Sequence, residues 1–361
     1  MLRKSAPSKK PSLFWLLTVI AFGLAFIGLI AIYNASVIES YQTFGDKYHF
    51  VKQQSKWLML AAVVYFSLSF VPSKVFEKIA LPFFVVSLVF LVAVIIPGVG
   101  TKLLGARRWL DLGPISFQPS ELIKISMVLY LSFWLKDSQP FKNFVVIIGA
   151  CLGLIMLQPD LGTAVVVSSI GFTLYYLSGC EIKRVLMFLT GLLGFVVILI
   201  FSSPYRMDRL QTFLDPQSDP LGRSYHINQV LLGLGSGGFS GVGLGKSRQK
   251  YAYLPEATTD SIFTIIGEET GFVGGTLLIL MLLALCMIGF RIASQATDKH
   301  QRLIAAGIAT LFASQTFVNI SAMVALVPLT GVPLPLISYG GSALVSNFIS
   351  LGILSSIAKN K

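Results

Sequence analysis

Long apolar runs separated by short polar connections dominate this chain. Runs such as 13–33, 79–96 and 185–201 are long enough to cross a hydrocarbon core of roughly 30 Å. The pattern predicts an all-α, polytopic integral membrane protein with a single membrane domain over residues 1–361. We expect about ten transmembrane helices, at 14–33, 57–71, 79–96, 119–135, 143–157, 162–178, 185–202, 261–290, 303–327 and 343–358.

Basic residues mark alternate connections between these segments. Lys and Arg concentrate in the short cytoplasmic loops of membrane proteins. Fifteen of the 28 Lys and Arg residues fall before the first span, in alternate short loops or in the C-terminal tail. Only four acidic residues share those positions. We therefore predict a multi-pass protein of the cytoplasmic (inner) membrane, with the N-terminal tail (1–12) and the C terminus both cytoplasmic.

Composition agrees with a lipid environment, because 54% of the residues are hydrophobic and only 12% are charged. The net charge of +12 could indicate a nucleic-acid partner. Its surplus lies beside helix ends on the predicted cytoplasmic side, where anionic membrane lipid fits better, and no nucleic-acid partner is expected. Cys151, Cys180 and Cys286 lie in or beside apolar spans without CxxC spacing, which indicates neither a disulfide framework nor a metal site.

The polar residues gather on the predicted outer face. It carries a loop at 97–120, a turn at 158–162 and a large extracellular loop at 203–260. Loops longer than about 12–15 residues are usually functional or disordered. Apolar residues from Ile227 to Leu234 keep helical spacing, which predicts an amphipathic helix lying on the membrane within the large loop.

The loop at 97–120 leads into an ionisable pair, Glu121 and Lys124. Their spacing fits a simple ion pair at a helix start. Lys124, however, lies inside the membrane boundary, where an ionisable group costs about 2.5–3.5 kcal/mol and normally faces an interior cavity. Arg107 and Arg108 lie just upstream and suit phosphate binding.

Asp160, in the turn at 158–162, has two interpretations. It could cap the following helix, since Asp favours that position. It could equally bind a cation or orient a substrate hydroxyl on the outer face.

Glycines crowd the stretch from Gly235 to Lys246. This is not a Walker A loop, because Ser240 stands where that motif requires glycine. We expect the glycines to let the backbone turn sharply and approach a neighbour closely.

Asp260 lies where the eighth span begins, so it could be an N-cap. A helix N-terminus stabilises a carboxylate and weakens it as a base. Burial beside lipid, with Glu256 or Glu268 nearby, would act in the opposite direction. The sequence leaves both interpretations open.

The segment from Val327 to Ser342 contains three prolines and three glycines at membrane depth. Irregular backbone there must be buried in protein or line a wet cavity. We predict a re-entrant segment that walls a site.

Taken in order, these stretches resemble the SEDS family of peptidoglycan glycosyltransferases (the FtsW/RodA/SpoVE family) over essentially the whole chain. The motifs are Arg107-Arg-Trp with Phe117-Gln-Pro-Ser-Glu-Leu-x-Lys124, Gln158-Pro-Asp-x-Gly-Thr163, Gly235-Ser-Gly-Gly238, Leu254-Pro-Glu-x-x-Thr-Asp260 and Pro333-Leu-Pro-x-x-Ser-Tyr-Gly-Gly-Ser342. Lys250 and the sequence Gly267-Glu-Glu269 look nearer the cell-division branch (FtsW) or its sporulation relative than the elongation branch. Thr258, Ser261 and Ala325 depart from the usual family pattern.

The resemblance implies an inverting enzyme that polymerises lipid II on the outer face of the membrane during cell division. It implies that Asp260 is the catalytic base and that Glu121 and Lys124 form a catalytic pair in a central cavity. In that mechanism Arg107, Arg108 and Lys124 stabilise the charge on the leaving pyrophosphate, and Glu121 holds Lys124 in place. We expect Asp260 and Lys124 to share one water-accessible groove. The predicted substrate-binding residues are Arg107, Arg108, Gln118, Asp160, Gln229, Lys250, Glu256 and Ser338.

The implied ligands and partners follow from the same resemblance. They are lipid II, the undecaprenyl-pyrophosphate glycan, a class B penicillin-binding protein and other division proteins. A divalent cation, Mg²⁺ or Mn²⁺, is an expected cofactor, but the sequence does not identify its ligands. No nucleotide is expected, because the sugar donor is already activated by its pyrophosphate. The alternative is a flippase that transports lipid II, since intramembrane charges and broken helices also suit transport. A structural scaffold of the division machinery is a third class.

Overall fold

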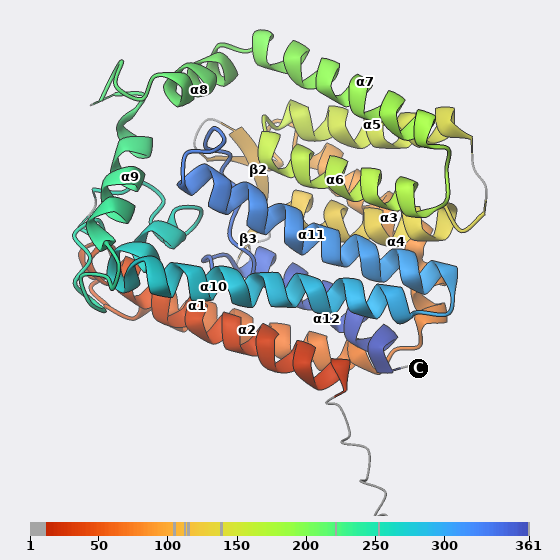
Figure 1. The fold of residues 1–361 in the computed structure, drawn as a ribbon, viewed down its shortest axis with the longest axis horizontal. Coiled ribbons are helices and arrows are strands. Elements are labelled where there is room, and N and C mark those ends of the chain that lie inside the picture. Colours follow the sequence, from red (N-terminus) through yellow and green to blue (C-terminus); the bar gives the residue numbers. More distant parts are fainter. Residues whose placement is uncertain are drawn as a thin grey trace, which may run out of the picture.

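The computed structural model describes residues 12–103, 106–111, 113, 116–137, 140–220, 222–251 and 253–359. Most of the predicted tail at 1–12 therefore lies outside the described residues. Ten long helices occupy the places of the ten predicted spans and run side by side (Figure 1). They are α1 (Leu13–Phe44), α2 (His49–Ser69), α3 (Ser73–Ala93), α4 (Pro119–Trp134), α5 (Phe141–Leu157), α6 (Leu161–Leu177), α7 (Ile182–Phe201), α10 (Ile262–Gln295), α11 (Lys299–Met323) and α12 (Gly341–Lys359).

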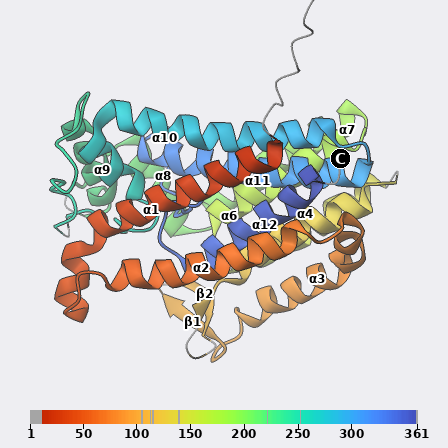
Figure 2. The same ribbon diagram turned by 90° about the horizontal axis from the view of Figure 1, so that it is seen from below.

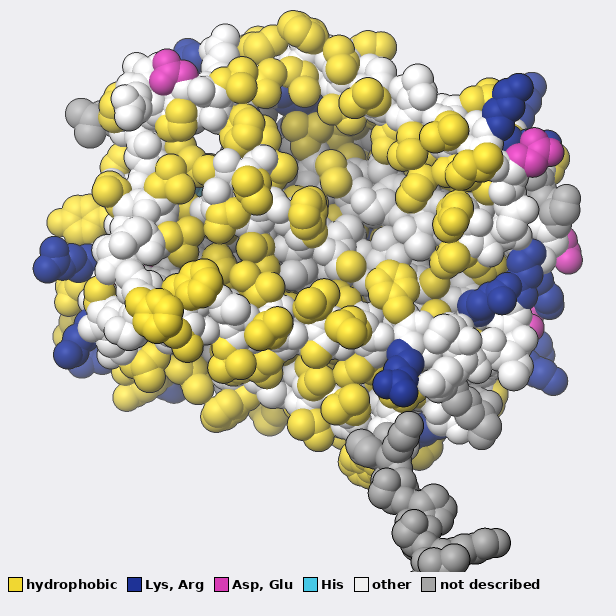
Figure 3. Space-filling view, viewed as in Figure 1, with side chains coloured by type: hydrophobic (Ala, Val, Ile, Leu, Met, Phe, Trp, Pro, Cys, Tyr) yellow, Lys and Arg dark blue, Asp and Glu magenta, His cyan; other side chains and the backbone are white. Residues whose placement is uncertain are grey.

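Six of these helices, within the described residues, are long and apolar enough to cross a membrane alone, namely α1, α3, α7, α10, α11 and α12. The helix α4 is shorter and carries Ser, Glu and Lys side chains, but almost all of it is buried inside the protein. On the face that Figure 3 shows, hydrophobic side chains cover the middle, and Lys and Arg lie mostly toward the two ends. This distribution fits a polytopic membrane protein.

The helix α1 is longer than predicted. It continues from residue 33 to Phe44, for a total of 32 residues. At about 1.5 Å per residue it is ~48 Å long, more than the hydrocarbon core requires. The apolar run stops at polar residues such as Asn34 and Glu39, but the helix continues through them beyond that core.

The loops that are rich in Lys and Arg lie together at one end of the molecule, as the charge pattern predicts. Lys136, after α4, pairs with Glu77 of α3 at 3.1 Å. Gln301 of α11 donates to the Ser73 hydroxyl of α3 at 2.8 Å, and Ser356 of α12 bonds to the turn between α2 and α3. We call this the basic end. Figures 1 and 2 place α9 at the opposite end from the C terminus.

The loop at 97–120 contains a small sheet that the sequence pattern did not predict. The strands β1 (Gly100–Leu103), β2 (Ala106–Asp111) and β3 (Ser116–Phe117) pair antiparallel in the order β1-β2-β3. Strands this short offer too few alternating positions to stand out in a mostly apolar chain. Across the described part of the chain, the fold is therefore all-α except for this sheet.

The large loop contains two further helices, α8 (Pro204–Leu214) and α9 (Tyr225–Gly237). The amphipathic helix predicted around 227–234 is confirmed as α9, with Ile227 and Val230 buried and Leu232 61% exposed. Its buried face packs on α10. A Cβ atom on Gly233 would lie 2.6 Å from the Thr264 methyl group, so only glycine fits at this contact. That α9 lies on the membrane stays a prediction.

The glycine-rich stretch after α9 pairs with a break in α10. Gly271 interrupts α10 with φ 66° and ψ −164°. Beside it, Phe272 N donates to the Gly238 carbonyl at 2.9 Å, and Val242 N donates to the Glu268 carbonyl at 3.0 Å. A Cβ on Gly241 would lie 2.1 Å from the Glu269 carbonyl oxygen. The prediction that these glycines allow close backbone approach is confirmed.

The chain between α11 and α12 is non-helical, as the prolines and glycines predict. Its residues Val332, Leu334, Leu336 and Ile337 are all buried. A Cβ on Gly28 of α1 would lie 2.8 Å from the Leu336 carbonyl oxygen, so the segment packs tightly against α1. The backbone from Val332 to Ser338 is therefore largely buried in protein, and the residues before it, Val327, Pro328 and Leu329, form one wall of a cavity beside Asp260.

Candidate functional site

Asp260 lies in a turn just before α10. Asn319 of α11 donates from Nδ2 to the Asp260 carbonyl at 2.7 Å and to the Val332 carbonyl at 2.8 Å. The Thr259 hydroxyl donates to Asp260 Oδ1 at 3.1 Å. The N-cap of α10 is Ser261, whose side chain makes no capping hydrogen bond. The structure therefore gives Asp260 a place in a cavity wall and not the capping role that the sequence left open.

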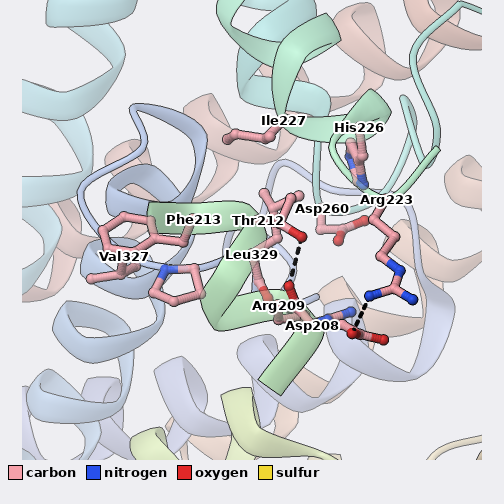
Figure 4. A pocket seen from close by; sticks show the side chains of 11 residues that line it. Asp208, Arg209, Thr212, Phe213, Arg223, His226, Ile227, Asp260, Val327 and Leu329 are labelled. Atoms are coloured by element: carbon pink, nitrogen blue, oxygen red, sulfur yellow. Dashed lines mark hydrogen bonds and ion pairs between the residues drawn. The ribbon is translucent and has the colours of Figure 1, made fainter. Parts of the chain in front are cut away.

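The Asp260 carboxylate lines a cavity of about 280 Å³ (Figure 4). The helices α8 and α9, the turn between them and the irregular segment after α11 supply the other walls. In Figure 4 the Asp260 carboxylate, the His226 ring and the Arg223 guanidinium face the same space. The lining residues are Asp208, Arg209, Thr212, Phe213, Arg223, His226, Ile227, Asp260, Val327, Pro328 and Leu329.

The surroundings of Asp260 favour its action as a general base. Burial, with a smaller contribution from the negative charge of Glu256, raises the pKa of Asp260 to about 6. The Thr259 hydroxyl and Arg209 oppose this rise without cancelling it. A carboxylate with a pKa near the working pH is well suited to general-base catalysis, because it is mostly deprotonated yet still basic.

His226 of α9 also faces the cavity. Burial and the neighbouring Arg209 lower the pKa of His226 to about 4. The ring is therefore neutral at pH 7. Its Nε2 shares a hydrogen bond of 2.8 Å with the Ser261 hydroxyl, next to Asp260. The neutral ring adds a polar contact to the cavity without adding a charge.

The cations in this cavity come from α8 and the turn after it. Arg209 donates to the Leu329 carbonyl of the opposite wall. Arg223 pairs with Asp208 at 2.6 Å, with both side chains well exposed. Exposed ion pairs contribute about 0–1 kcal/mol, so Arg223 can exchange this partner for another anion at small cost.

Glu121 and Lys124 do not line the Asp260 cavity. They pair with each other at 2.7 Å, with side chains 4% and 3% exposed. Ser346 of α12 donates to the Glu121 carbonyl, so α12 covers the pair. The expectation that Asp260 and Lys124 share one open groove is therefore not met. Any catalytic role of the pair stays a prediction.

Two predicted substrate contacts are engaged in holding the fold. Arg108 of β2 donates to the carbonyls of Gln158 and Pro159 in the turn between α5 and α6. Asp160 caps α6, because its Oδ1 accepts from Thr163 N at 3.0 Å. The capping interpretation of Asp160 is confirmed. Arg107 is partly exposed on β2 and does not line the Asp260 cavity.

The other predicted substrate contacts also lie outside the cavity lining. Ser338 is buried and donates to the Thr259 carbonyl at 2.6 Å, so it ties the irregular segment to the turn that carries Asp260. Lys250 donates to the Gly245 carbonyl, and Glu256 accepts from the Thr259 hydroxyl at 2.7 Å. Gln118 and Gln229 are partly buried, at the start of α4 and on α9.

Sequence reasoning missed most of the polar cavity residues, namely Asp208, Arg209, Arg223 and His226. One signal was available. The stretch 206–223 carries three arginines and several acids in a chain with only 12% charged residues.

Sequence reasoning also gave Glu268 no definite role. This buried carboxylate of α10 accepts from Arg248 N at 3.0 Å and from the Ser247 hydroxyl. It therefore anchors the end of the glycine-rich stretch to α10.

No cluster of three or more His, Cys, Asp or Glu side chains is arranged to hold a metal ion within the described residues. Asp260 and Asp208 line the same cavity, but Asp208 is paired with Arg223. A cation bound here would need most of its ligands from water or from a bound molecule.

Comparisons with known proteins cover nearly the whole chain. The family model FTSW_RODA_SPOVE, described as "Cell cycle protein", matches residues 14–361. "Stage V sporulation protein E" of Bacillus subtilis is 38% identical, covering 98% of each chain. "Probable peptidoglycan glycosyltransferase FtsW" of Trichlorobacter lovleyi is 36% identical, covering 99% of this chain and 96% of that protein.

Two solved structures are also similar. One is a chain from a study of polymerisation and crosslinking by a peptidoglycan synthase complex, with a TM-score of 0.79 and 27% identity over 96% of this chain and 97% of that chain. The other is the rod shape determining protein RodA of Thermus thermophilus, with a TM-score of 0.71 and 28% identity over 96% of each chain.

Proposed function

The chain belongs to the FtsW/RodA/SpoVE family of cell-cycle proteins, and we propose that it is a peptidoglycan glycosyltransferase that polymerises lipid II during cell division. Two relatives that match 99% and 93% of the chain carry the name "Probable peptidoglycan glycosyltransferase FtsW". The observation that carries the chemistry is a carboxylate, Asp260, with a pKa near 6 in a cavity that also holds Arg209 and Arg223.

The proposed reaction forms one glycosidic bond and breaks one sugar–phosphate bond. The 4-hydroxyl of an acceptor lipid II attacks the anomeric carbon of the growing glycan from the side opposite its pyrophosphate, which inverts that carbon. Asp260 takes the hydroxyl proton, and undecaprenyl pyrophosphate leaves with the bonding electron pair. General-base assistance of this kind contributes about 10²–10⁴-fold.

Arg209 and Arg223 are suited to bind the leaving pyrophosphate and to stabilise the negative charge that develops on it. Guanidinium groups bind phosphate through paired N–H donors. Donors placed where charge develops are usually the largest catalytic contribution of a site. In this mechanism Arg209 and Arg223 bind the pyrophosphate in place of Arg107, Arg108 and Lys124. Glu121 and Lys124 would act at a distance from Asp260.

A divalent cation, Mg²⁺ or Mn²⁺, fits this site only together with the substrate. Mg²⁺ is often held by one or two carboxylates and substrate phosphates. Asp208 could supply a protein carboxylate once Arg223 turns to the pyrophosphate, and the pyrophosphate would supply further oxygens. The ion would then neutralise phosphate charge, and Asp260 would stay free to act as the base. Removing divalent ions with a chelator should then lower polymerisation, with recovery on addition of Mg²⁺ or Mn²⁺. Unchanged activity would contradict this part of the proposal.

The proposed setting is the cytoplasmic membrane, with the basic end in the cytoplasm and the Asp260 cavity on the outer side. Lys and Arg favour the cytoplasmic side. Asp260, which lines the cavity, lies just before the start of α10. From there α10 runs along the molecule to the basic end (Figure 1). Lipid II would reach the cavity from the bilayer. A class B penicillin-binding protein is the proposed partner, in keeping with a structural relative from a peptidoglycan synthase complex.

The competing function is transport of lipid II. Alternating access requires a binding site near the bilayer midplane. The cavity lies instead beside the start of α10, opposite the basic end, which favours chemistry on one face. Vesicles carrying the protein, its penicillin-binding partner and lipid II separate the two functions. Polymer without faster lipid II exchange between leaflets supports the enzyme, whereas exchange without polymer supports the transporter.

A further inference from the structure

A second cavity, of about 670 Å³, opens at the basic end, far along the helices from Asp260. The start of α1 and the ends of α2, α10 and α12 form its walls. The lining residues are Ser12, Leu13, Phe14, Trp15, Phe66, Phe70, Gln295, Ala358 and Lys359. Its volume lies within the roughly 300–1,000 Å³ of small-molecule sites. None of the proposed chemistry uses this cavity.

Lys359 is the one charged side chain among these lining residues. Its Nζ lies 4.1 Å from the centre of the Phe14 ring and 3.7 Å from the centre of the Phe70 ring. It also donates to the Ser69 hydroxyl at 3.1 Å. Cation–π contacts hold the ammonium group in place but leave its charge uncompensated. Among the described residues, the lining of this cavity therefore presents a fixed positive charge without a carboxylate partner.

The rim of this cavity is aromatic and open. Trp15 is 61% exposed and Phe70 is 76% exposed. Aromatic side chains concentrate at the level of the lipid headgroups in membrane proteins. The positions of these rings at helix ends, next to a fixed lysine, fit a molecule with an anionic head and an apolar body.

The basic end as a whole carries a net positive charge, which matches a molecule with an anionic head. Its helix ends and connections carry ten basic residues against four acidic ones among the described residues. The basic residues are Lys74, Lys78, Lys136, Lys142, Lys183, Arg184, Arg291, Lys299, Arg302 and Lys359, and the acidic ones are Glu77, Asp137, Glu181 and Asp298. The inner leaflet attracts such segments through its anionic lipids.

We propose that this cavity binds one anionic phospholipid of the surrounding membrane. The phosphate lies at Lys359, and the glycerol and upper acyl chains lie on Trp15, Phe66 and Phe70. The chain's own N-terminal segment is the other occupant to consider. Its sequence carries Arg3, Lys4, Lys9 and Lys10, so its charge repels Lys359 and does not complement it.

Native mass spectrometry of the full chain, released from a mixture of phosphatidylglycerol and phosphatidylethanolamine, tests this proposal. The wild-type protein should retain phosphatidylglycerol in preference to phosphatidylethanolamine. Loss of one lysine near a lipid surface is worth about 1 kcal/mol, so Lys359→Gln should reduce this preference about fivefold. Lys359→Arg should keep it. Lys183→Gln, an exposed lysine of the basic end that does not line the cavity, is the matched control.

Two results would overturn the proposal. One is a wild-type protein that retains both lipids equally, which would leave the cavity to a zwitterionic lipid or to the N-terminal segment. The other is an equal loss of preference in Lys359→Gln and Lys183→Gln, which would mean a general surface effect. Phe70→Ala provides a variant with unchanged charge, and it should also lower retention of phosphatidylglycerol. Full retention in that variant would contradict the assigned position of the lipid.

Discussion

Asn319 holds the main chain of Asp260, because its Nδ2 donates to the Asp260 carbonyl at 2.7 Å and also to the Val332 carbonyl. One buried amide on α11 thus joins the turn that carries the carboxylate to the irregular segment that forms the opposite wall. The cavity depends on this link, since neither wall is part of a regular helix.

Replacing Asn319 with alanine should therefore damage the site from a distance. It leaves two buried carbonyl groups without their donor, which costs about 1–3 kcal/mol each. We expect a lower melting temperature in detergent and slower lipid II polymerisation. Ser314→Ala is the control on the same helix, because that hydroxyl bonds only to the preceding turn. Equal behaviour of the two variants would show that Asn319 does not support the site.

The rate of polymerisation should rise with pH through the pKa of Asp260, which is about 6. A general base must be deprotonated, so activity is low near pH 5 and approaches a plateau above about pH 7. A rate that falls over this range would contradict the role of Asp260 as a base.

The stability of the protein should fall as pH rises, which is opposite to the trend of the polymerisation rate. The folded state raises the pKa of Asp260 above its ordinary value, so it binds the proton more tightly than the unfolded chain. Asp260 therefore lowers stability as pH rises through about 6. The Asp260→Asn variant should then be at least as stable as the wild type at pH 7, as measured by thermal unfolding in detergent.

Arg223→Gln should slow the chemical step. Removing one donor that stabilises developing charge costs about 10²–10³ in rate at well-studied sites, and we expect a loss of up to that order. Single-turnover polymerisation measures it directly. Arg184→Gln removes an arginine with a similar exposed ion pair, to Glu181, at the basic end and should leave the rate unchanged. A normal rate for Arg223→Gln would remove this residue from the proposed mechanism.

The buried pair of Glu121 and Lys124 can be tested by changing one residue and then both. Lys124→Met alone leaves a buried, unpaired carboxylate, which costs about 3–5 kcal/mol. Glu121→Gln combined with Lys124→Met removes both charges and should restore most of the stability. If the stable double variant is also active, the pair is structural. If it folds but makes little polymer, the pair serves the reaction.

Much of the fold could be read from the sequence, because apolar runs must form helices where no water can satisfy the backbone. All ten predicted spans have a helix in place, and the prolines and glycines near Val332 correctly indicated an irregular, buried segment. The end of α1 was missed because polar residues such as Asn34 signal the edge of lipid, but not the end of a helix.

The site was less accessible to sequence reasoning. Asp260 was identified, yet its cationic neighbours were assigned to the fourth span, because Lys124 stands out in an apolar run. In the structure Lys124 is satisfied by Glu121, one turn away. Arg209 and Arg223 reach the cavity only because α8 and α9 fold back over it. The density of charge in 206–223 marks this stretch as unusual, but it does not say which cavity these side chains reach.

The central claim is that Asp260 is the base of a polymerase, and one measurement tests it most directly. Purified wild-type and Asp260→Asn proteins are each reconstituted with the class B penicillin-binding partner and given lipid II, and glycan chains are resolved by gel electrophoresis. The account predicts long chains from the wild type and none from a normally folded Asp260→Asn protein. Chains of normal length and yield from the variant would contradict it.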